Sequence, residues 1–365
     1  MNDFFLFSHV RNWYAKWERP ISSLSLVGGF IFDAVTLTRI DAFWDNFWVV
    51  AHLVIVAVAI IAINREEETS TDYKDPARMH FWLINVLQFF FGGLLSTFLV
   101  FYFRSATLSV SWPFFLILAV AFIANESFKK HFARIVFQVS FFFLCLFSFD
   151  IFLVPVVVHS IGRATFVLSD IVTLAILGIF LWLLASWSKG KLHKSARAIF
   201  ISIAGIFVII NILYFLNIIP PIPLSLRDAG IYHSVSSDGN GNYIVSYEDR
   251  GWLSFFDYSP DFHEVSDASI YAYTAIFSPA NLSTNIIHNW QRYDDTNKSW
   301  VTVSRVELFV SGGRDGGFRT YSIQSNLLPG DWRVSVETPD GAVVGRLRFT
   351  IVSGSPVNLK TEIKN

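Results

Sequence analysis

Four ionisable side chains lie within otherwise apolar stretches of the chain, and they are the residues best suited to chemistry. They are Asp33, His52, Asp150 and Asp170. A carboxylate buried in a bilayer costs about 3 kcal/mol or more unless it is paired or hydrated. Such a group therefore needs an arginine, a hydrogen-bonding neighbour, a bound cation or a water-filled cavity.

The three aspartates are expected at a common depth. Each lies six to nine residues from the outer end of its apolar segment. At about 1.5 Å per helical residue, this places their carboxylates roughly 9–14 Å below one membrane surface, with His52 at a similar level. The arginines that could pair with them stand alone in the loops at that end: Arg39, Arg104 and Arg163.

Three interpretations of this intramembrane polar layer are open. Packing is favoured, with each aspartate bonded to a neighbouring helix or to an outer arginine. The alternative is a water-filled vestibule that binds or relays something from outside. A metal site is least favoured, because spacing alone does not show that ligands converge. Carboxylates that meet beside an open cleft would favour the vestibule, and separate neighbours would favour packing.

Membrane-spanning helices must position this layer. Seven apolar segments are long enough to cross a hydrocarbon core of about 30 Å: 21–39, 43–63, 80–103, 106–124, 135–158, 165–187 and 198–219. The first is the weakest because Asp33 interrupts it, so a six-helix arrangement with 21–63 folded as a re-entrant pair stays open. Only 16% of residues are charged, against about 25% in soluble domains. We therefore predict a seven-helix transmembrane domain over 21–219.

Loop charges predict the orientation. The flank 1–20 and the loops 64–79, 125–134 and 188–197 carry 13 lysines and arginines, whereas the alternate loops carry three. Because basic loops stay on the cytoplasmic side, the N-terminus is expected in the cytoplasm and residues 222–365 outside it, at the inner membrane. The flank 1–20 is predicted as either an amphipathic interfacial helix or an ordinary basic flank. No cleavable signal peptide is expected, because a short apolar run with a small-residue cleavage site is missing.

Charge and cysteine content exclude some functions. Residues 1–221 have a net charge of +3 (16 basic, 13 acidic), and residues 222–365 a net charge of −4 (12 basic, 16 acidic). Neither balance favours nucleic acid, which requires a clustered basic face. The single cysteine, Cys145, lies in an apolar segment, so we expect no disulfide. No metal-ligand or cofactor motif is recognised, and no cofactor is expected.

After the proline-rich exit at 220–223, the apolar pattern changes to a period of two residues. Strands are predicted near 230–236, 242–248, 251–257, 269–277, 285–293, 300–310, 317–325, 331–338 and 343–352. Short strands separated by Gly, Pro and Asp turns are typical of an antiparallel, immunoglobulin-like sandwich. The predicted boundaries are a linker at 220–227, a β-rich leader at 228–262, the sandwich at 263–355 and a polar tail at 356–365.

Several side chains of the β region are candidates for a ligand or partner surface. His288 and Trp290 share a face of one predicted strand, so they form either a core pair or a ligand-contacting platform. Arg314 lies in the glycine-rich turn 311–317, which is either a flexible hairpin or an anion contact. Arg319 follows it. Trp332 is expected in the core, and Arg333 on the opposite face, where it could pair with an acidic residue.

Several motifs together suggest a family. The segment LPGDWRVSVETPDGAVVGRLRFTI at 328–351 resembles a bacterial C-terminal domain of unknown function that follows multi-pass inner-membrane segments. Further motifs fit the same family: LVGGFIFDAVTLTRID at 26–41, GIYHSV at 230–235, YEDRGW at 247–252, IHNWQ at 287–291 and SGGRDGGFRTY at 311–321. The resemblance implies an integral membrane protein with an exported β domain, and it implies no activity.

We therefore expect a non-enzymatic membrane protein that presents a periplasmic β-sandwich for binding, sensing or envelope assembly. Its expected partners are the lipid bilayer and an envelope protein or glycan. The alternative is a transporter or membrane-embedded enzyme in which Asp33, Asp150 and Asp170 line an outward cavity capped by the β domain.

Overall fold

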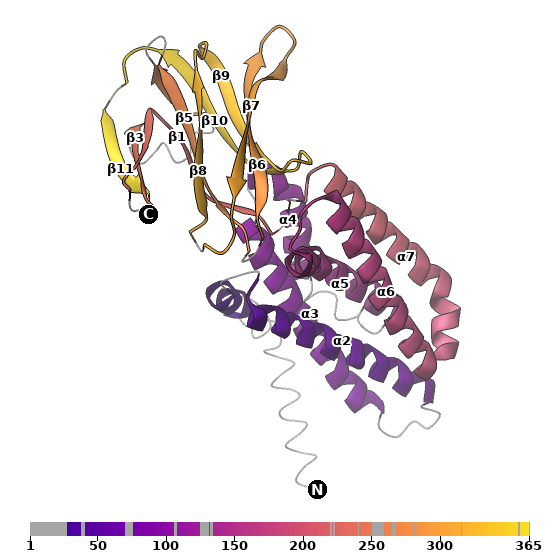
Figure 1. Ribbon diagram of the computed structural model, residues 1–365. Helices are drawn as coiled ribbons and strands as arrows, with labels where there is room; N and C mark the ends of the chain where they lie inside the picture. The colour runs from indigo at the N-terminus through magenta and orange to yellow at the C-terminus, as the bar shows by residue number, and fades with distance from the viewer. Residues whose placement is uncertain are drawn as a thin grey trace. The chain divides into compact units, whose positions relative to one another are not determined.

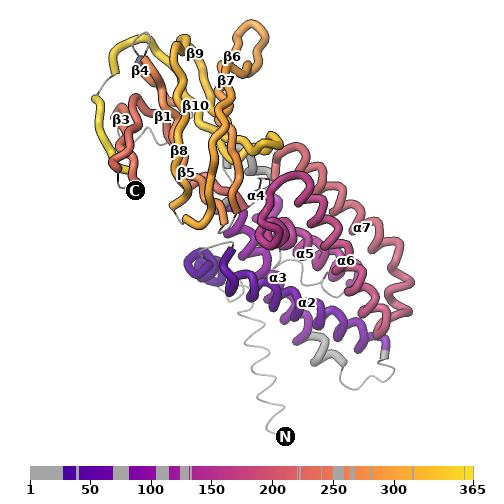
Figure 2. The backbone as a smooth tube through the Cα atoms, in the orientation of Figure 1, coloured from indigo at the N-terminus to yellow at the C-terminus, as the bar shows by residue number. Residues whose placement is uncertain are grey.

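The structure is a computed structural model of the 365-residue chain (Figures 1 and 2). It describes residues 28–37, 41–69, 76–105, 108–124, 131, 134–219, 221, 223–239, 241–249, 259–264, 268–279, 282–314, 316–356 and 358–364. The chain divides into two compact units, which are described separately. The first comprises Met1–Tyr102, Phe115–Leu153 and Ser169–Ile212, and the second comprises Phe103–Phe114, Val154–Leu168 and Leu213–Asn365.

Seven helices precede the strands in the described part of the chain. The first covers residues 28–36. The others are α2 (Phe43–Thr69), α3 (Pro76–Ser105), α4 (Leu108–Ala124), α5 (Ile135–Val158), α6 (Arg163–Trp187) and α7 (Lys189–Phe215). Five of them, α2, α3, α5, α6 and α7, are long and apolar enough to cross a membrane. The predicted segments thus form helices. Five of the seven predicted spans meet the length and hydropathy of a membrane-crossing helix.

The boundary between α6 and α7 differs from the prediction. Residues 188–197 were expected as a loop, but only Ser188 separates the two helices. Its hydroxyl donates to the Asn64 carbonyl at 3.0 Å, and the Gly190 N–H in the first turn of α7 donates to Glu68 Oε1 at 2.8 Å. Since a carboxylate accepts an N–H that the helix itself leaves unsatisfied, the basic stretch continues as helix.

Phenylalanine rings form much of the interior of the helical unit. Ring pairs join α5 to α3 (Phe91–Phe141, 4.8 Å), to α6 (Phe142–Phe180, 4.5 Å) and to α7 (Phe147–Phe207, 5.8 Å). The α5 helix is accordingly the most buried of the five, at 72% of its apolar window, and α7 the least, at 11%. Among the described residues, phenylalanines thus serve both as core and as exposed apolar surface, such as Phe200 on α7.

The strands form three sheets. They are β1 (Ser225–Tyr232), β2 (Ser234–Ser237), β3 (Tyr243–Glu248), β4 (Asp261–Glu264), β5 (Ser269–Phe277), β6 (Thr284–Asp294), β7 (Ser299–Val310), β8 (Phe318–Ser325), β9 (Gly330–Glu337), β10 (Val343–Ser353) and β11 (Leu359–Lys364). Their orders are β1-β5-β8, β4-β10-β9-β6-β7 and β11-β3-β2. The pairs are antiparallel except β4 with β10, which is parallel.

A hydrophobic core joins the first two sheets. Ile270 and Ala272 of β5 pack with Trp290 of β6, Trp332 of β9 and Phe349 of β10, and all five are buried. Alternation explains this, because Trp332, Val334 and Val336 share one side of β9 and Phe349 and Ile351 share one side of β10. The expected core position of Trp332 is confirmed by its exposed fraction of 2%.

Two predicted domain boundaries are wrong. The linker 220–227 already contains the start of β1, because Ser225 pairs with Phe277 of β5. The polar tail 356–365 contains β11, which pairs with β3 from Leu359 to Lys364. Backbone pairing and the Lys364–Asp228 ion pair at 3.2 Å hold this strand, whose two large apolar side chains, Leu359 and Ile363, are exposed. The predicted strand 251–257 lies outside the described residues.

Candidate functional site

The intramembrane aspartates have separate neighbours. The Thr173 hydroxyl of α6 donates to Asp150 Oδ2 of α5 at 2.7 Å, and both residues are buried. Asp170 of α6 lies beside Asn211 of α7. Asp33 lies beside Ser96 of α3 and close to His52 of α2. Among the described residues, no three His, Cys, Asp or Glu side chains gather as a metal-ligand group would.

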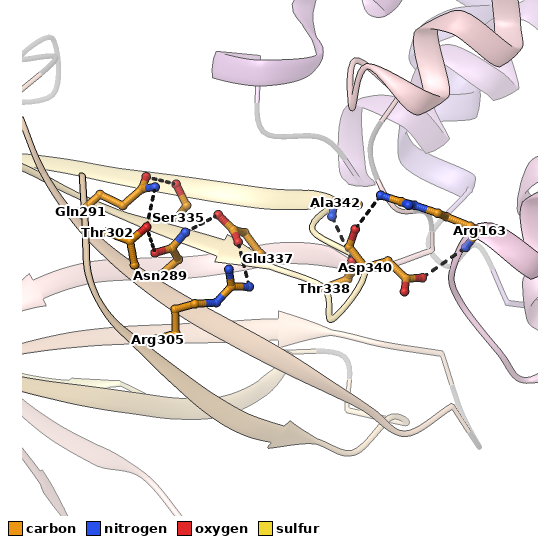
Figure 3. A network of polar contacts seen from close by, with 10 residues as sticks. All are labelled: Arg163, Asn289, Gln291, Thr302, Arg305, Ser335, Glu337, Thr338, Asp340 and Ala342. Atoms are coloured by element: carbon orange, nitrogen blue, oxygen red, sulfur yellow. Dashed lines mark hydrogen bonds and ion pairs between the residues drawn. The ribbon is translucent and has the colours of Figure 1, made fainter. Parts of the chain in front are cut away.

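Of the three outer arginines, the structure describes the side chain of Arg163. Arg39 and the side chain of Arg104 lie outside the described residues. Arg163 belongs to the second unit, where its Nη2 donates to the Asp340 carbonyl and its backbone N–H donates to Asp340 Oδ2, both at 3.2 Å (Figure 3). Arg163 therefore contacts the turn 339–341 within its own unit. A carboxylate at the first residue of α6 is favourable because helix N-termini attract negative charge.

His288 and Trp290 belong to the interior, so their inclusion in a ligand surface is corrected. Both have an exposed fraction of 0%. The Trp290 indole donates to the Ser322 hydroxyl at 2.9 Å, and the His288 ring bonds Ser322 at 2.8 Å and Thr274 at 3.0 Å. These bonds link β6 to β5 and β8. Burial lowers the pKa of His288 to about 4, so the imidazole is neutral at physiological pH.

Arg314 and Arg319 lie on other parts of the second unit. The exposed Arg314 guanidinium lies over the Phe318 ring at 5.3 Å. Arg319 on β8 donates to the Gly241 carbonyl at 2.9 Å. They therefore do not combine with His288 and Trp290 into one site.

Instead, polar side chains gather on the side of the five-stranded sheet that faces away from the core. This outer face is defined by twelve residues: Asn289, Gln291 and Tyr293 of β6; Trp300, Thr302, Arg305 and Glu307 of β7; Arg333, Ser335 and Glu337 of β9; and Arg346 and Arg348 of β10. Successive side chains of a strand point to opposite sides of the sheet. The outer-face residues therefore point away from the core, because the residues between them on β6, β9 and β10 point into it.

Hydrogen bonds connect the outer face across three strands (Figure 3). The Asn289 amide donates to Glu337 Oε1 at 3.0 Å, and Glu337 Oε2 lies 3.7 Å from the Arg305 guanidinium. The Thr302 hydroxyl donates to Asn289 Oδ1 at 3.1 Å and accepts from the Gln291 amide at 3.3 Å. Each amide therefore uses both its donor and its acceptor, and the side chains are held in one arrangement.

The network ends at an aromatic cluster. Arg333 Nε donates to Gln291 Oε1 at 2.6 Å, and the Arg333 guanidinium lies over the Trp300 ring at 4.3 Å. Arg348 lies 5.9 Å from the same ring, and the Tyr293 ring is 5.3 Å away. These five residues, Gln291, Tyr293, Trp300, Arg333 and Arg348, are called the tryptophan end of the outer face. A cation over an indole is worth about 0.5–1 kcal/mol.

Two features distinguish this face from an ordinary solvated sheet. Asn289, Ser335 and Glu337 are buried although they face away from the core, while the Arg305 side chain is 50% exposed. Arg348 and Arg333 are direct cross-strand partners, an arrangement of like charges that usually destabilises a sheet. The outer face therefore combines a buried amide and a buried carboxylate with a cross-strand pair of arginines.

Sequence reasoning placed only Arg333 near this site. Its guanidinium bonds the Gln291 amide and stacks on Trp300. The alternating arginines at 346 and 348 were a signal in the sequence. Their meeting with Trp300 depends on strand order and could not be read from spacing.

Comparison with known proteins assigns part of the chain. Residues 283–351 match a protein family of unknown function, DUF2914. The chain therefore carries a C-terminal domain of unknown function, and all twelve outer-face residues lie inside it. No curated protein matches.

Solved structures resemble the chain only weakly. A β-glucosidase from Listeria innocua in complex with gluconolactone matches at 11% identity and a TM-score of 0.19, over 36% of this chain and 16% of that chain. The Pseudomonas fluorescens alkylpurine DNA glycosylase AlkC, bound to DNA containing an abasic site analog, matches at 11% identity and a TM-score of 0.22, over 83% of this chain and 97% of that chain. The matched region thus spans less than a fifth of the β-glucosidase.

Proposed function

We propose that the chain is a multi-pass inner-membrane protein whose C-terminal domain is an immunoglobulin-like sandwich in the periplasm. The domain binds an envelope partner through the outer face and carries out no catalysis. The observation that carries this proposal is the continuous side-chain network from Arg305 to Arg333, which ends on Trp300.

The helices support the membrane part of the proposal. Five are long and apolar enough to span a bilayer, and large apolar side chains such as Trp182 and Phe200 are 69% and 72% exposed. Exposed apolar surface of this kind is favourable in lipid and costly in water. The 13 basic residues in alternate loops and adjoining helix ends, against three at the opposite ends, support a periplasmic β domain.

The chemistry of the outer face supports binding rather than proton transfer. Its polar groups are mainly amides, hydroxyls and guanidinium groups, which do not change protonation near neutral pH. General acid–base catalysis uses groups whose pKa lies near the working pH. Groups with fixed charge and fixed hydrogen-bond direction are suited to recognising a partner.

The transporter or membrane-enzyme alternative receives less support. It needs the acidic side chains to share a cavity, and the neighbours of Asp33, Asp150 and Asp170 differ, on α3, α6 and α7 respectively. Each neighbour supplies a polar group within the protein, as the packing interpretation requires.

Photo-crosslinking in living cells tests the proposed function. A benzophenone amino acid at Glu307, exposed on the outer face, is expected to give an adduct of higher apparent mass. The same residue at Ile323 of β8, 46% exposed on the other sheet, is the matched control. Trp300→Ala should weaken the Glu307 adduct. Equal adducts at both positions, or none at Glu307, would contradict the proposal.

A further inference from the structure

The tryptophan end concentrates positive charge in a domain that is acidic as a whole. Residues 222–365 have a net charge of −4, yet Arg333 and Arg348 stand directly opposite each other on β9 and β10. Side chains at such positions start about 5 Å apart. Each carries a guanidinium group with several N–H donors, and both lie near the Trp300 ring, so the pair suits a ligand with negative charge.

The geometry of Arg333 narrows the kind of anion. Its guanidinium stacks on the Trp300 ring at 4.3 Å, and its Nε donates to Gln291. Stacking occupies the flat side of a guanidinium group, whose N–H bonds point outward in its plane and match the two oxygens of a carboxylate. Because the Arg333 guanidinium group is held in one orientation, it is better suited to bonding the two oxygens of a carboxylate than to attracting a surface of spread negative charge.

The neighbours of the arginines indicate what carries the carboxylate. Trp300 and Tyr293 are both partly exposed beside the Gln291 amide and the Thr302 hydroxyl. Aromatic rings stack on the apolar faces of sugar rings, and amides bond hydroxyl groups. A protein partner would instead favour an apolar centre with a polar rim, whereas the centre of this face is the hydrogen-bonded row Asn289, Gln291 and Thr302.

We propose that the tryptophan end binds an acidic polysaccharide, a chain of sugar rings that bear carboxylate groups. The arginine pair Arg333 and Arg348 bonds the carboxylates, Trp300 contacts a sugar ring, and Gln291 bonds hydroxyl groups. This inference rests on the proposed function and names the class of ligand for the same face.

The test uses the full-length protein in nanodiscs of uncharged lipid at about 50 mM salt, where exposed charges are weakly screened. The probe is an oligomer of galacturonic acid, and the matched probe is the same oligomer with its carboxylates methyl-esterified. We expect the acid form to bind at least tenfold more tightly than the ester.

Variants locate the binding. Arg333→Gln, Arg348→Gln and Trp300→Ala should each weaken binding of the acid form at least tenfold. Arg227→Gln, which removes an exposed arginine of β1 on the other sheet, should leave it unchanged. Arg348→Gln keeps the test valid if Arg333→Gln fails to fold, which circular dichroism would reveal.

Several outcomes would overturn the inference. Equal binding of acid and ester would reject carboxylate recognition, and equal weakening by Arg227→Gln would reject the location. Binding to phosphatidylglycerol vesicles that needs Arg333, without binding of the oligomer, would assign the face to a lipid surface. A Glu307 adduct in cells without oligomer binding rejects the ligand class alone, whereas the absence of both rejects the proposed function as well.

Discussion

Lowering the pH should destabilise the β domain through His288. The buried ring has a pKa of about 4 in the folded domain, against about 6.5 in an unfolded chain. Between these values the unfolded chain binds more protons than the folded one, so stability is lost as the pH falls from 6.5 towards 4. At about 1.4 kcal/mol per pKa unit, the loss between pH 7.5 and pH 4 is about 3 kcal/mol.

The assay is urea unfolding of residues 222–365, followed by tryptophan fluorescence at both pH values. Carboxylates also titrate over this range, so His288→Gln is the matched control: glutamine can bond Thr274 and Ser322 but does not titrate. The wild-type free energy of unfolding should fall by about 3 kcal/mol more than that of His288→Gln. If the free energy of unfolding fell equally in the two proteins, the claim that His288 is buried and neutral would be refuted.

Three further predictions concern stability. Trp332→Ala should lower the free energy of unfolding of residues 222–365 by about 3–5 kcal/mol, since it opens a cavity in the core; an unchanged urea midpoint would place Trp332 outside the core. Glu248→Gln should cost about 2 kcal/mol, because the buried Glu248 carboxylate accepts from His233 and His263 at 2.9–3.0 Å. Glu307→Gln, at an exposed position, is its control and should cost under about 0.5 kcal/mol; equal costs would remove any special role for Glu248. Asp150→Asn and Thr173→Val, measured by thermal unfolding of the full-length protein in detergent, should together cost less than their sum by about 0.6 kcal/mol, and strictly additive costs would contradict the bond between them.

Much of the architecture follows from apolar periodicity. The runs at 135–158 and 343–352 correspond to α5 and β10 with nearly the predicted bounds, since a long apolar run needs a helix in lipid and alternation needs a half-buried strand. The start of α7 was missed because its first turn is basic and polar. In the first turn of α7, the Gly190 N–H donates to the Glu68 carboxylate, 122 residues earlier in the chain.

The candidate site was harder to read from the sequence, for a physical reason. Adjacent strands in the sheet are not adjacent in the chain, so β7, β6, β9 and β10 bring Trp300 to Arg333 and Arg348 only through the sheet order. Conversely, His288 and Trp290 look like a binding pair because polar and aromatic residues share one side of a strand. Ser322 and Thr274 from two other strands satisfy them in the interior.

The placement of the β domain outside the cytoplasm is the claim on which binding to an envelope partner depends. The single native cysteine, Cys145, is buried, so one introduced cysteine reports its own position. Val301→Cys, 47% exposed on β7, should react with a membrane-impermeant maleimide in intact spheroplasts. Lys194→Cys, exposed near the start of α7, should react only after lysis. Labelling of Lys194→Cys before lysis, with Val301→Cys protected until lysis, would contradict the proposed orientation.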